Sequence, residues 1–315
     1  MADGSAKRMI RNGLRYALGA LAAVLAGPGL AAPPVVGILQ GNAVLVRQTT
    51  RWQLAEGAML AEGDIIETAA GGFVQIEFDD GALLGLGESA KLLLQPRLGK
   101  GGGVPRAYVM EGFAKARPAD DPKAAALALL SPRLELEASG GAVVAQFNAK
   151  AVSVFTERGN ARLATRDAAR STLTAKAGDF ASLPAGGKLA IAPRMSPEFL
   201  EQLPKPFRDA LPARAALLVN KRPTLKALGP IDYAGVQPWL TAEPLVRLPL
   251  ARQWRGMAAD RAFRGELAAH LSAHPEWERV LYPERFLPKP RRPMPPRAPA
   301  SAAPVAAPAA SAATP

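Results

Sequence analysis

The sequence of 315 residues contains no cysteine, only two histidines, and few aromatic residues (6%). Without cysteine the chain has no disulfide framework, no thiol nucleophile and no lipid anchor through an N-terminal cysteine. Beyond these two, the chain has no histidine that could activate a serine in a catalytic triad, and no Gly-x-Ser-x-Gly motif is present. Stability must therefore come from packing alone.

The two histidines are not expected to hold a metal. His270 and His274 have an i, i+4 spacing, with Glu276 or Glu278 as a conceivable third ligand. Pro275 ends the helix directly after His274 and spoils the orientation of that ligand. The three intervening residues also lack the glutamate of the metalloprotease motif. We expect no metal and no cofactor.

The acidic residues do not form a catalytic pair. Neighbours in a strand point to opposite faces, so Asp79 and Asp80 do not converge as acid and base. Asp64 is expected to cap its own turn. The glycine-rich loop at 99–103 lacks the Ser or Thr that follows the lysine of a phosphate-binding loop, which indicates a flexible hairpin loop. The chain is therefore not expected to be an enzyme.

Residues 1–32 are typical of an export signal. A basic region ends at Arg15, an apolar run covers 16–26, and Leu30-Ala31-Ala32 offers small residues for cleavage. The alternative is an uncleaved inner-membrane anchor, since residues 16–39 are free of charge and long enough to span a bilayer. Gly27-Pro28-Gly29 would interrupt that helix, so cleavage near Ala32 and a periplasmic location are predicted.

The formal net charge is +12, and removal of residues 1–32 leaves +9. An exported basic protein is not expected to meet nucleic acid. An envelope protein or an anionic wall or lipid surface is the expected partner, with no membrane span after signal cleavage. The alternative is a solvated arginine-rich surface without a partner.

Residues 54–94 are the most patterned part of the chain. Val74, Ile76 and Phe78 alternate with polar residues, which predicts a half-buried strand. Asp80-Gly81 predicts the turn of a hairpin. The remaining glycine and aspartate positions are predicted to lie in structural turns. The full set of these turn positions is Gly63, Asp64, Gly72, Asp80, Gly81, Gly178, Asp179 and Gly187.

Spaced motifs over residues 40–165 carry a family resemblance. They are Gly41-x-x-Val44, Leu54-x-x-Gly57-x-x-Leu60, Gly63-Asp64-x-Ile66-x-Thr68, Gly72, Ile76-x-Phe78-x-Asp80-Gly81-x-Leu83 and Leu86-Gly87-x-Ser89. Through these positions the chain resembles the periplasmic FecR-type domain. The resemblance implies a mainly β, non-catalytic interaction domain. FecR-type regulators carry a cytoplasmic anti-sigma segment before a membrane helix. Only about 15 residues precede the apolar run here, so an anti-sigma segment is not expected.

The expected fold is mainly β, a core of stacked short strands arranged as a sandwich or short solenoid, followed by a small α-helical C-terminal unit. The β domain is placed at 33–193, with two related β units at about 40–95 and 134–192. The offset from Gly-Asp to Gly-Gly is eight residues in both units, and Gly41-Asn42 is echoed by Gly159-Asn160. Stacked layers that share a core would explain this repeat, and chance similarity of turns is the alternative.

The composition of the chain changes after residue 193, where proline and arginine become more frequent. Residues 194–230 are predicted as a Pro/Arg-rich linker with short helices, 231–287 as a small helical unit, and 288–315 as a disordered Pro/Ala-rich tail. Two hypotheses are open for the helical unit. Its aromatic residues pack as a cap on the β core, or they form an exposed partner surface. That surface would consist of Trp239, Arg252, Trp254 and Trp277.

Two functions follow. The first is an exported, non-catalytic binding or scaffold module of the cell envelope. The second is a membrane-tethered accessory of a FecR-type regulatory system.

Overall fold

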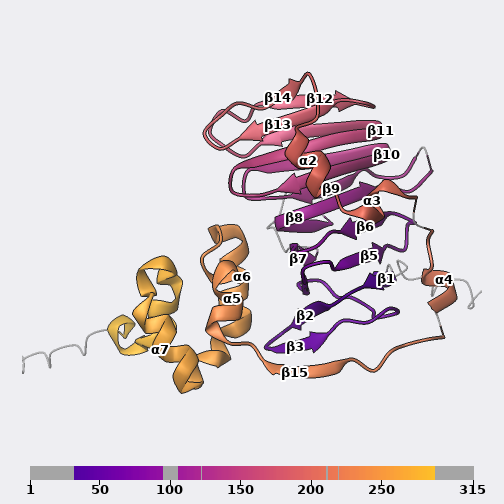
Figure 1. Cartoon of the computed structure of the whole chain (residues 1–315). Helices are drawn as coiled ribbons and strands as arrows, with labels where there is room; N and C mark the ends of the chain where they lie inside the picture. Colours follow the sequence, from indigo (N-terminus) through magenta and orange to yellow (C-terminus); the bar gives the residue numbers. More distant parts are fainter. Residues whose placement is uncertain (1–31, 95–105, 122, 211, 219, 288–315) are drawn as a thin grey trace, which may run out of the picture.

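The structure is a computed structural model, and it describes residues 32–94, 106–121, 123–210, 212–218 and 220–287. Residues 1–31 of the predicted signal, the glycine-rich loop at 99–103 and the predicted tail lie outside these residues. The described chain is mainly β, as predicted, with short helices in its C-terminal part (Figure 1). The strands of the first part are β1 (Val35–Gln40), β2 (Ala43–Arg47), β3 (Thr50–Gln53), β4 (Ile65–Thr68), β5 (Phe73–Glu77), β6 (Leu83–Leu86) and β7 (Lys91–Leu94). They are followed by β8 (Ala107–Arg117), β9 (Leu127–Leu130), β10 (Leu134–Phe147), β11 (Ala151–Thr165), β12 (Thr172–Lys176), β13 (Phe180–Pro184), β14 (Ala190–Ala192) and β15 (Lys226–Pro230).

The β structure has two layers, and three long strands run through both of them. Residues 107–111 of β8 pair with β7, whereas residues 114–117 of the same strand pair with β6. The long strands β10 and β11 change partners in the same way along their length. We call the layer with β1, β5, β6, β13 and β14 layer A, and the layer with β2, β3, β4, β7, β9 and β12 layer B. The long strands therefore belong to both layers.

Glycines allow the long strands to bend between the layers. Gly112 in β8 has φ of 98°, and Gly159 in β11 has φ of 78°. A Cβ atom would come within 2.4 Å of the Ala90 Cα at residue 112, and within 2.2 Å of the Ser139 carbonyl oxygen at residue 159. Only glycine combines this backbone angle with so close an approach.

The main core lies between the two layers. Val36, Ile76 and Leu84 point inward from layer A, and Leu45 and Leu92 point inward from layer B. All five side chains are fully buried. Burying each of them stabilises the fold by roughly 1.5–3 kcal/mol relative to exposure. The Ala-rich second unit contributes to the same core through smaller side chains, such as Ala161 and Ala175.

The predicted hairpin at Asp80-Gly81 is present. Strands β5 and β6 pair antiparallel, with Val74 opposite Leu86. The Phe78 N–H donates to the Ala82 carbonyl at 2.9 Å across the turn. The outward face of β5 is not exposed, however, because Gln75 and Glu77 are only 3% and 4% exposed. The prediction of a half-buried strand was wrong here, since the C-terminal part of the chain covers this face.

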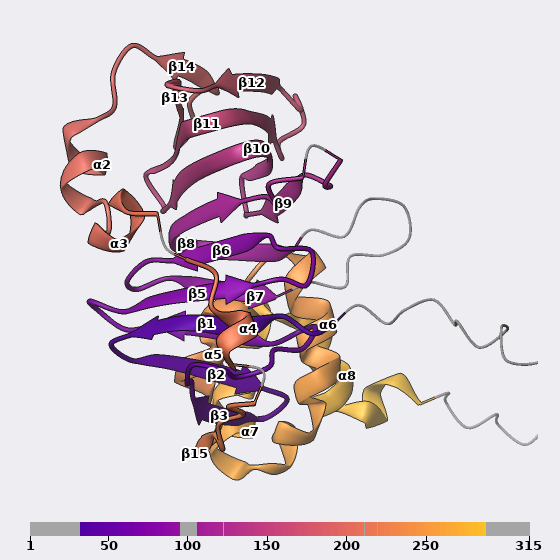
Figure 2. The ribbon, with the colours of Figure 1, turned by 90° about the vertical axis from the view of Figure 1, so that its right-hand side faces the viewer.

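Residues 194–210 and 212–218 cover the outer face of layer A (Figure 2). They form α2 (Pro197–Gln202), α3 (Lys205–Arg208) and α4 (Ala215–Leu218). Phe199 and Phe207 pack on Phe73, Phe113 and Phe180 of the sheet. Ser196 caps α2 by accepting the Phe199 N–H at 3.1 Å. This segment, which we call the strap, therefore packs on the sheet. Residues 226–230 extend it as β15, which pairs with β3 at the edge of layer B.

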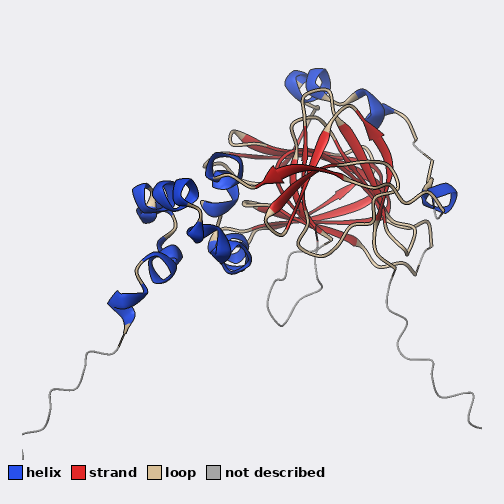
Figure 3. Ribbon diagram, turned by 90° about the horizontal axis from the view of Figure 1, so that it is seen from below, coloured by secondary structure: helices blue, strands red, loops and turns tan. Residues whose placement is uncertain are grey.

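The helices after β15 cover the outer face of layer B. Their order is α5 (Tyr233–Leu240), α6 (Pro244–Trp254), η1 (Arg255–Ala259), α7 (Arg261–Ala269), η2 (Leu271–Ala273), η3 (Pro275–Trp277), α8 (Glu278–Leu281) and η4 (Pro283–Phe286). Asp260 caps α7 by accepting the Phe263 N–H at 2.8 Å. Seen along the stack in Figure 3, the helices lie outside the strands. Within the described ranges, no helix is both long and apolar enough to cross a bilayer.

The two β units are related in part. Strand β2 follows Gly41 and pairs with β3, just as residues 160–164 of β11 follow Gly159 and pair with β12. The correspondence ends at the Gly-Asp turns. After the first turn, β4 pairs with β2 in layer B, whereas after the second turn, β13 pairs with residues 151–155 of β11 in layer A.

Candidate functional site

The Gly-Asp turns are two copies of one local structure. The Asp64 carboxylate accepts the Ala61 N–H at 2.8 Å, and the Asp179 carboxylate accepts the Lys176 N–H at 2.7 Å. Gly63 and Gly178 have φ of 82° and 89°. The predicted turn-capping role of Asp64 thus has a direct counterpart in the geometry.

The Gly-Gly turns also match each other. The Gly72 N–H donates to the Ala69 carbonyl at 2.9 Å, and the Gly187 N–H donates to the Pro184 carbonyl at 3.1 Å. In the hairpin turn, the Asp80 carboxylate accepts the Ala82 N–H at 3.0 Å. The predicted turn positions shape the backbone of five separate turns.

Asp64 has a second role that the sequence does not reveal. Arg47 donates two hydrogen bonds to its carboxylate, from Nε at 2.9 Å and from Nη2 at 2.5 Å. Asp64 is buried, whereas the guanidinium of Arg47 is partly exposed. The hydrogen bond to Asp64 raises the pKa of Arg47, with burial opposing it. The pair fixes the Gly63-Asp64 turn to β2.

The hypothesis that the tryptophans form an exposed partner surface was wrong. Trp239, Trp254 and Trp277 are all fully buried. The Trp239 Nε1–H donates to Oε1 of Glu67 at 2.9 Å, and the Trp254 Nε1–H donates to the Gln48 carbonyl at 2.7 Å. These residues dock the helical unit on layer B, as the packing hypothesis predicts. Helical periodicity alone cannot tell a docked apolar face from an exposed one.

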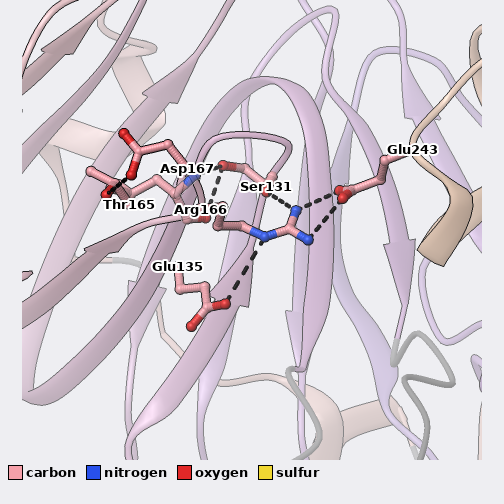
Figure 4. Close-up of polar contacts among 7 residues, drawn as sticks. Ser131, Glu135, Thr165, Arg166, Asp167 and Glu243 are labelled. Atoms are coloured by element: carbon pink, nitrogen blue, oxygen red, sulfur yellow. Dashed lines mark hydrogen bonds and ion pairs between the residues drawn. The ribbon is translucent and has the colours of Figure 1, made fainter. Parts of the chain in front are cut away.

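A charged network joins the same two parts (Figure 4). Arg166, in the loop after β11, donates from Nη2 to Glu243 Oε2 at 2.8 Å, and its Nη1 donates to the other oxygen and to the Ser131 carbonyl. Glu243 stands directly before α6. Desolvation, followed by the nearby Glu243 carboxylate, raises the pKa of the buried Tyr108 hydroxyl.

A groove of about 650 Å³ remains between the Gly63-Asp64 turn and α6. Its strand side includes Arg47, and its helix side includes Pro249, Arg252 and Gln253. The apolar part of its lining consists of Ala61, Leu93, Leu245, Val246, Pro249 and Leu250. Arg252 is exposed. Of the partner-surface residues predicted from the sequence, Arg252 alone is accessible, and the fold brings it to the predicted Gly-Asp turn.

Glu77 anchors the strap on the opposite layer. Its carboxylate accepts the N–H of Arg214 at 2.7 and 2.9 Å and that of Ala215 at 2.8 Å, and Gln75 donates to it at 3.1 Å. Gly37 leaves room for it, because a Cβ atom there would lie 1.8 Å from Oε1 of Glu77. The sequence does not reveal this contact, because the Arg214 donor lies 137 residues further along the chain.

The histidines do not form a metal site with their neighbours. The structure shows no cluster of three or more potential ligands in the part of the chain that it describes. His274 is fully buried, and its Nε2 lies 3.2 Å from the Tyr233 hydroxyl. Desolvation is the main effect that lowers the pKa of His274. His270 is exposed and stacks on the Tyr233 ring at 5.4 Å.

Comparisons with known proteins yield few matches. No family model matches the chain, and no curated protein is recognisably related to it. Two crystal structures of a proposed anti-sigma factor from Parabacteroides distasonis align with TM-scores of 0.35 and 0.34 at 13% identity. Each alignment covers 41% of this chain and 58% of the other, so this chain spans less than two thirds of that protein. At these scores the similarity carries no argument about function, and the FecR resemblance stays a prediction.

Proposed function

We propose that the chain is an exported, non-catalytic binding module of the cell envelope. The groove between the Gly63-Asp64 turn and α6 is its binding site, and a mainly apolar segment of an envelope protein with an acidic residue is its ligand. The observation that carries this proposal is a groove of about 650 Å³ with walls fixed from both sides. The FecR resemblance supports an interaction role, and residues 1–32 support export.

The walls of the groove are held by independent contacts. Arg47 and Asp64 fix the turn, and the Trp254 bond to the Gln48 carbonyl holds the end of α6. Arg166 and Glu243 hold its beginning. A groove with preformed walls binds without paying for the ordering of its own side chains and loops.

The composition of the groove selects its ligand. Its lining is more apolar than polar, which favours aliphatic or aromatic side chains. Arg252 is exposed at its edge and, among the described residues, forms no ion pair. An acidic side chain in the ligand would accept a charge-assisted hydrogen bond from this guanidinium.

The experiment is capture of envelope proteins on the purified mature chain. Arg252→Glu should reduce capture of the bound protein about tenfold, because it replaces an attraction by a repulsion. Arg255→Glu is the matched control, since Arg255 is exposed on η1 and does not line the groove. Equal capture by both variants and the parent would exclude the groove as the site. Truncation is unsuitable, because it would expose the apolar outer face of layer B.

Export and tethering are tested separately. We expect the mature N-terminus to follow Ala32 and the protein to be released by osmotic shock. The second candidate, a membrane-tethered accessory of a FecR-type regulatory system, rests on the uncharged stretch at 16–39. Recovery with inner membranes and an N-terminus that still includes Ala2 would favour it. Lack of catalysis predicts that the purified protein releases no fragments from peptidoglycan.

A further inference from the structure

A second cavity, of about 190 Å³, lies on the outer face of layer A under the strap. Strands β5, β6, β8, β10 and β11 form its base, and α3 with the two residues after it forms its roof. The cavity thus lies where the first β unit meets the second. It is separate from the groove on layer B.

Two of its four cations are already neutralised. Lys115 donates to Oε1 of Glu157 at 3.0 Å and to the Phe207 carbonyl at 2.6 Å. Arg117 forms an ion pair with Asp120. These pairs leave no net charge for a ligand.

The other two cations, Arg158 and Arg208, are exposed at the cavity. Neither forms an ion pair within the described ranges. The side chain of Arg208 makes one long hydrogen bond, to the Leu200 carbonyl at 3.5 Å. Asp209 also lines the cavity, so the unpaired groups together carry a net charge of about +1. A guanidinium presents a planar pair of donors that matches a carboxylate.

An aromatic pair lines the cavity, with Phe73 in its base and Phe207 in its roof. The two rings meet edge to face, with centroids 5.9 Å apart. Gly85 leaves space beside them, because a Cβ atom there would lie 3.0 Å from the Phe207 ring. The volume is below the roughly 300–1,000 Å³ of sites for drug-sized ligands, so it suits a single ring or a short aliphatic chain.

We propose that this cavity binds a small organic monoanion. Its carboxylate lies between Arg158 and Arg208, and its body lies against Phe73 and Phe207. A sugar acid and a short fatty acid share this chemistry. The site goes beyond the proposed protein-binding groove and does not depend on it.

The test is isothermal titration calorimetry of the mature protein with D-glucuronate and with hexanoate. Glucose and hexanol serve as neutral analogues. We expect at least one carboxylate to bind and its neutral analogue not to bind. The double variant Arg158→Ala/Arg208→Ala should weaken binding about tenfold or more, since each charged hydrogen bond contributes to affinity. Arg162→Ala is the matched control, because Arg162 lies on β11, is exposed, and does not line the cavity.

The outcomes separate the ligand sources. Binding of glucuronate alone assigns the site to sugar acids, and binding of hexanoate alone assigns it to aliphatic acids. Binding of neither, or equal loss in the double variant and in Arg162→Ala, overturns the proposal. An unchanged unfolding midpoint of the double variant shows that the loss is local. Protein capture by the groove should be unaffected by the double variant, so the two proposals fail independently.

Discussion

The Trp239 indole nitrogen donates a hydrogen bond to Oε1 of Glu67 at 2.9 Å, from α5 to β4 across 172 residues of sequence. It is one of the bonds that hold the helical unit on layer B. The bond also gives the buried indole N–H a charged acceptor at the interface. Docking of the helices on the sheet therefore depends on polar as well as apolar contacts.

Removing this bond should destabilise the fold by about 1.5–3 kcal/mol, the usual range for hydrogen bonds to charged groups. The change is Trp239→Phe, measured by urea unfolding. Trp277→Phe is the control, because Trp277 is equally buried and its Nε1 has no partner among the described residues. A loss in Trp277→Phe as large as that in Trp239→Phe would show that packing, and not the bond, holds the unit.

Loss of the Glu77 carboxylate should release the strap. In Glu77→Gln, one acceptor oxygen becomes a donor amide that faces the N–H groups of Arg214 and Ala215. We expect faster tryptic cleavage around Arg208 and Arg214, with a stability loss of about 1–3 kcal/mol. Glu56→Gln weakens the longer side-chain contact of Arg214, at 3.4 Å, while its amide oxygen can still accept the Leu39 N–H, and it should leave cleavage nearly unchanged.

The bend of β11 at Gly159 should not tolerate a side chain. Gly159→Ala combines a positive φ with an approach of 2.2 Å to the Ser139 oxygen, so the backbone must move. Gly178→Ala has a similar φ, and among the described residues nothing lies within 4 Å of the new Cβ. We expect Gly178→Ala to cost about 1–2 kcal/mol and Gly159→Ala to cost clearly more, as measured by thermal unfolding. Equal costs would mean that β11 adapts at its bend.

His274 should make the fold sensitive to acid. Burial lowers its pKa in the folded state, so the unfolded chain binds more protons as the pH falls below the unfolded pKa of about 6.5. Stability due to the neutral side chain is present above that pH and is lost progressively toward the lower folded pKa. The urea midpoint of the parent should fall between pH 7 and pH 5. His274→Gln should flatten this dependence, whereas His270→Gln, at an exposed site, should retain it.

The local features of the fold could be predicted because they depend on neighbouring residues. Alternation in residues 73–86 indicated the hairpin of β5 and β6, and Asp80-Gly81 marked its turn. Ser196 and Asp260 each accept an N–H three residues further along, at the starts of α2 and α7, so these caps are local contacts as well. The Gly-Asp turns were also visible, because Asp64 and Asp179 bind backbone within their own turns.

The sequence by itself determined the β class, the turns and the helix caps, because each follows from contacts within a few residues. Only the tertiary structure decided which apolar faces are covered. It buried Trp239 and Trp254 against layer B, and it placed Glu77 under a strap 137 residues away. Arg252 meets the Gly63-Asp64 turn for the same reason. Periodicity shows that a face is apolar, but its partner is set by long-range packing, in which burial of area outweighs any local preference.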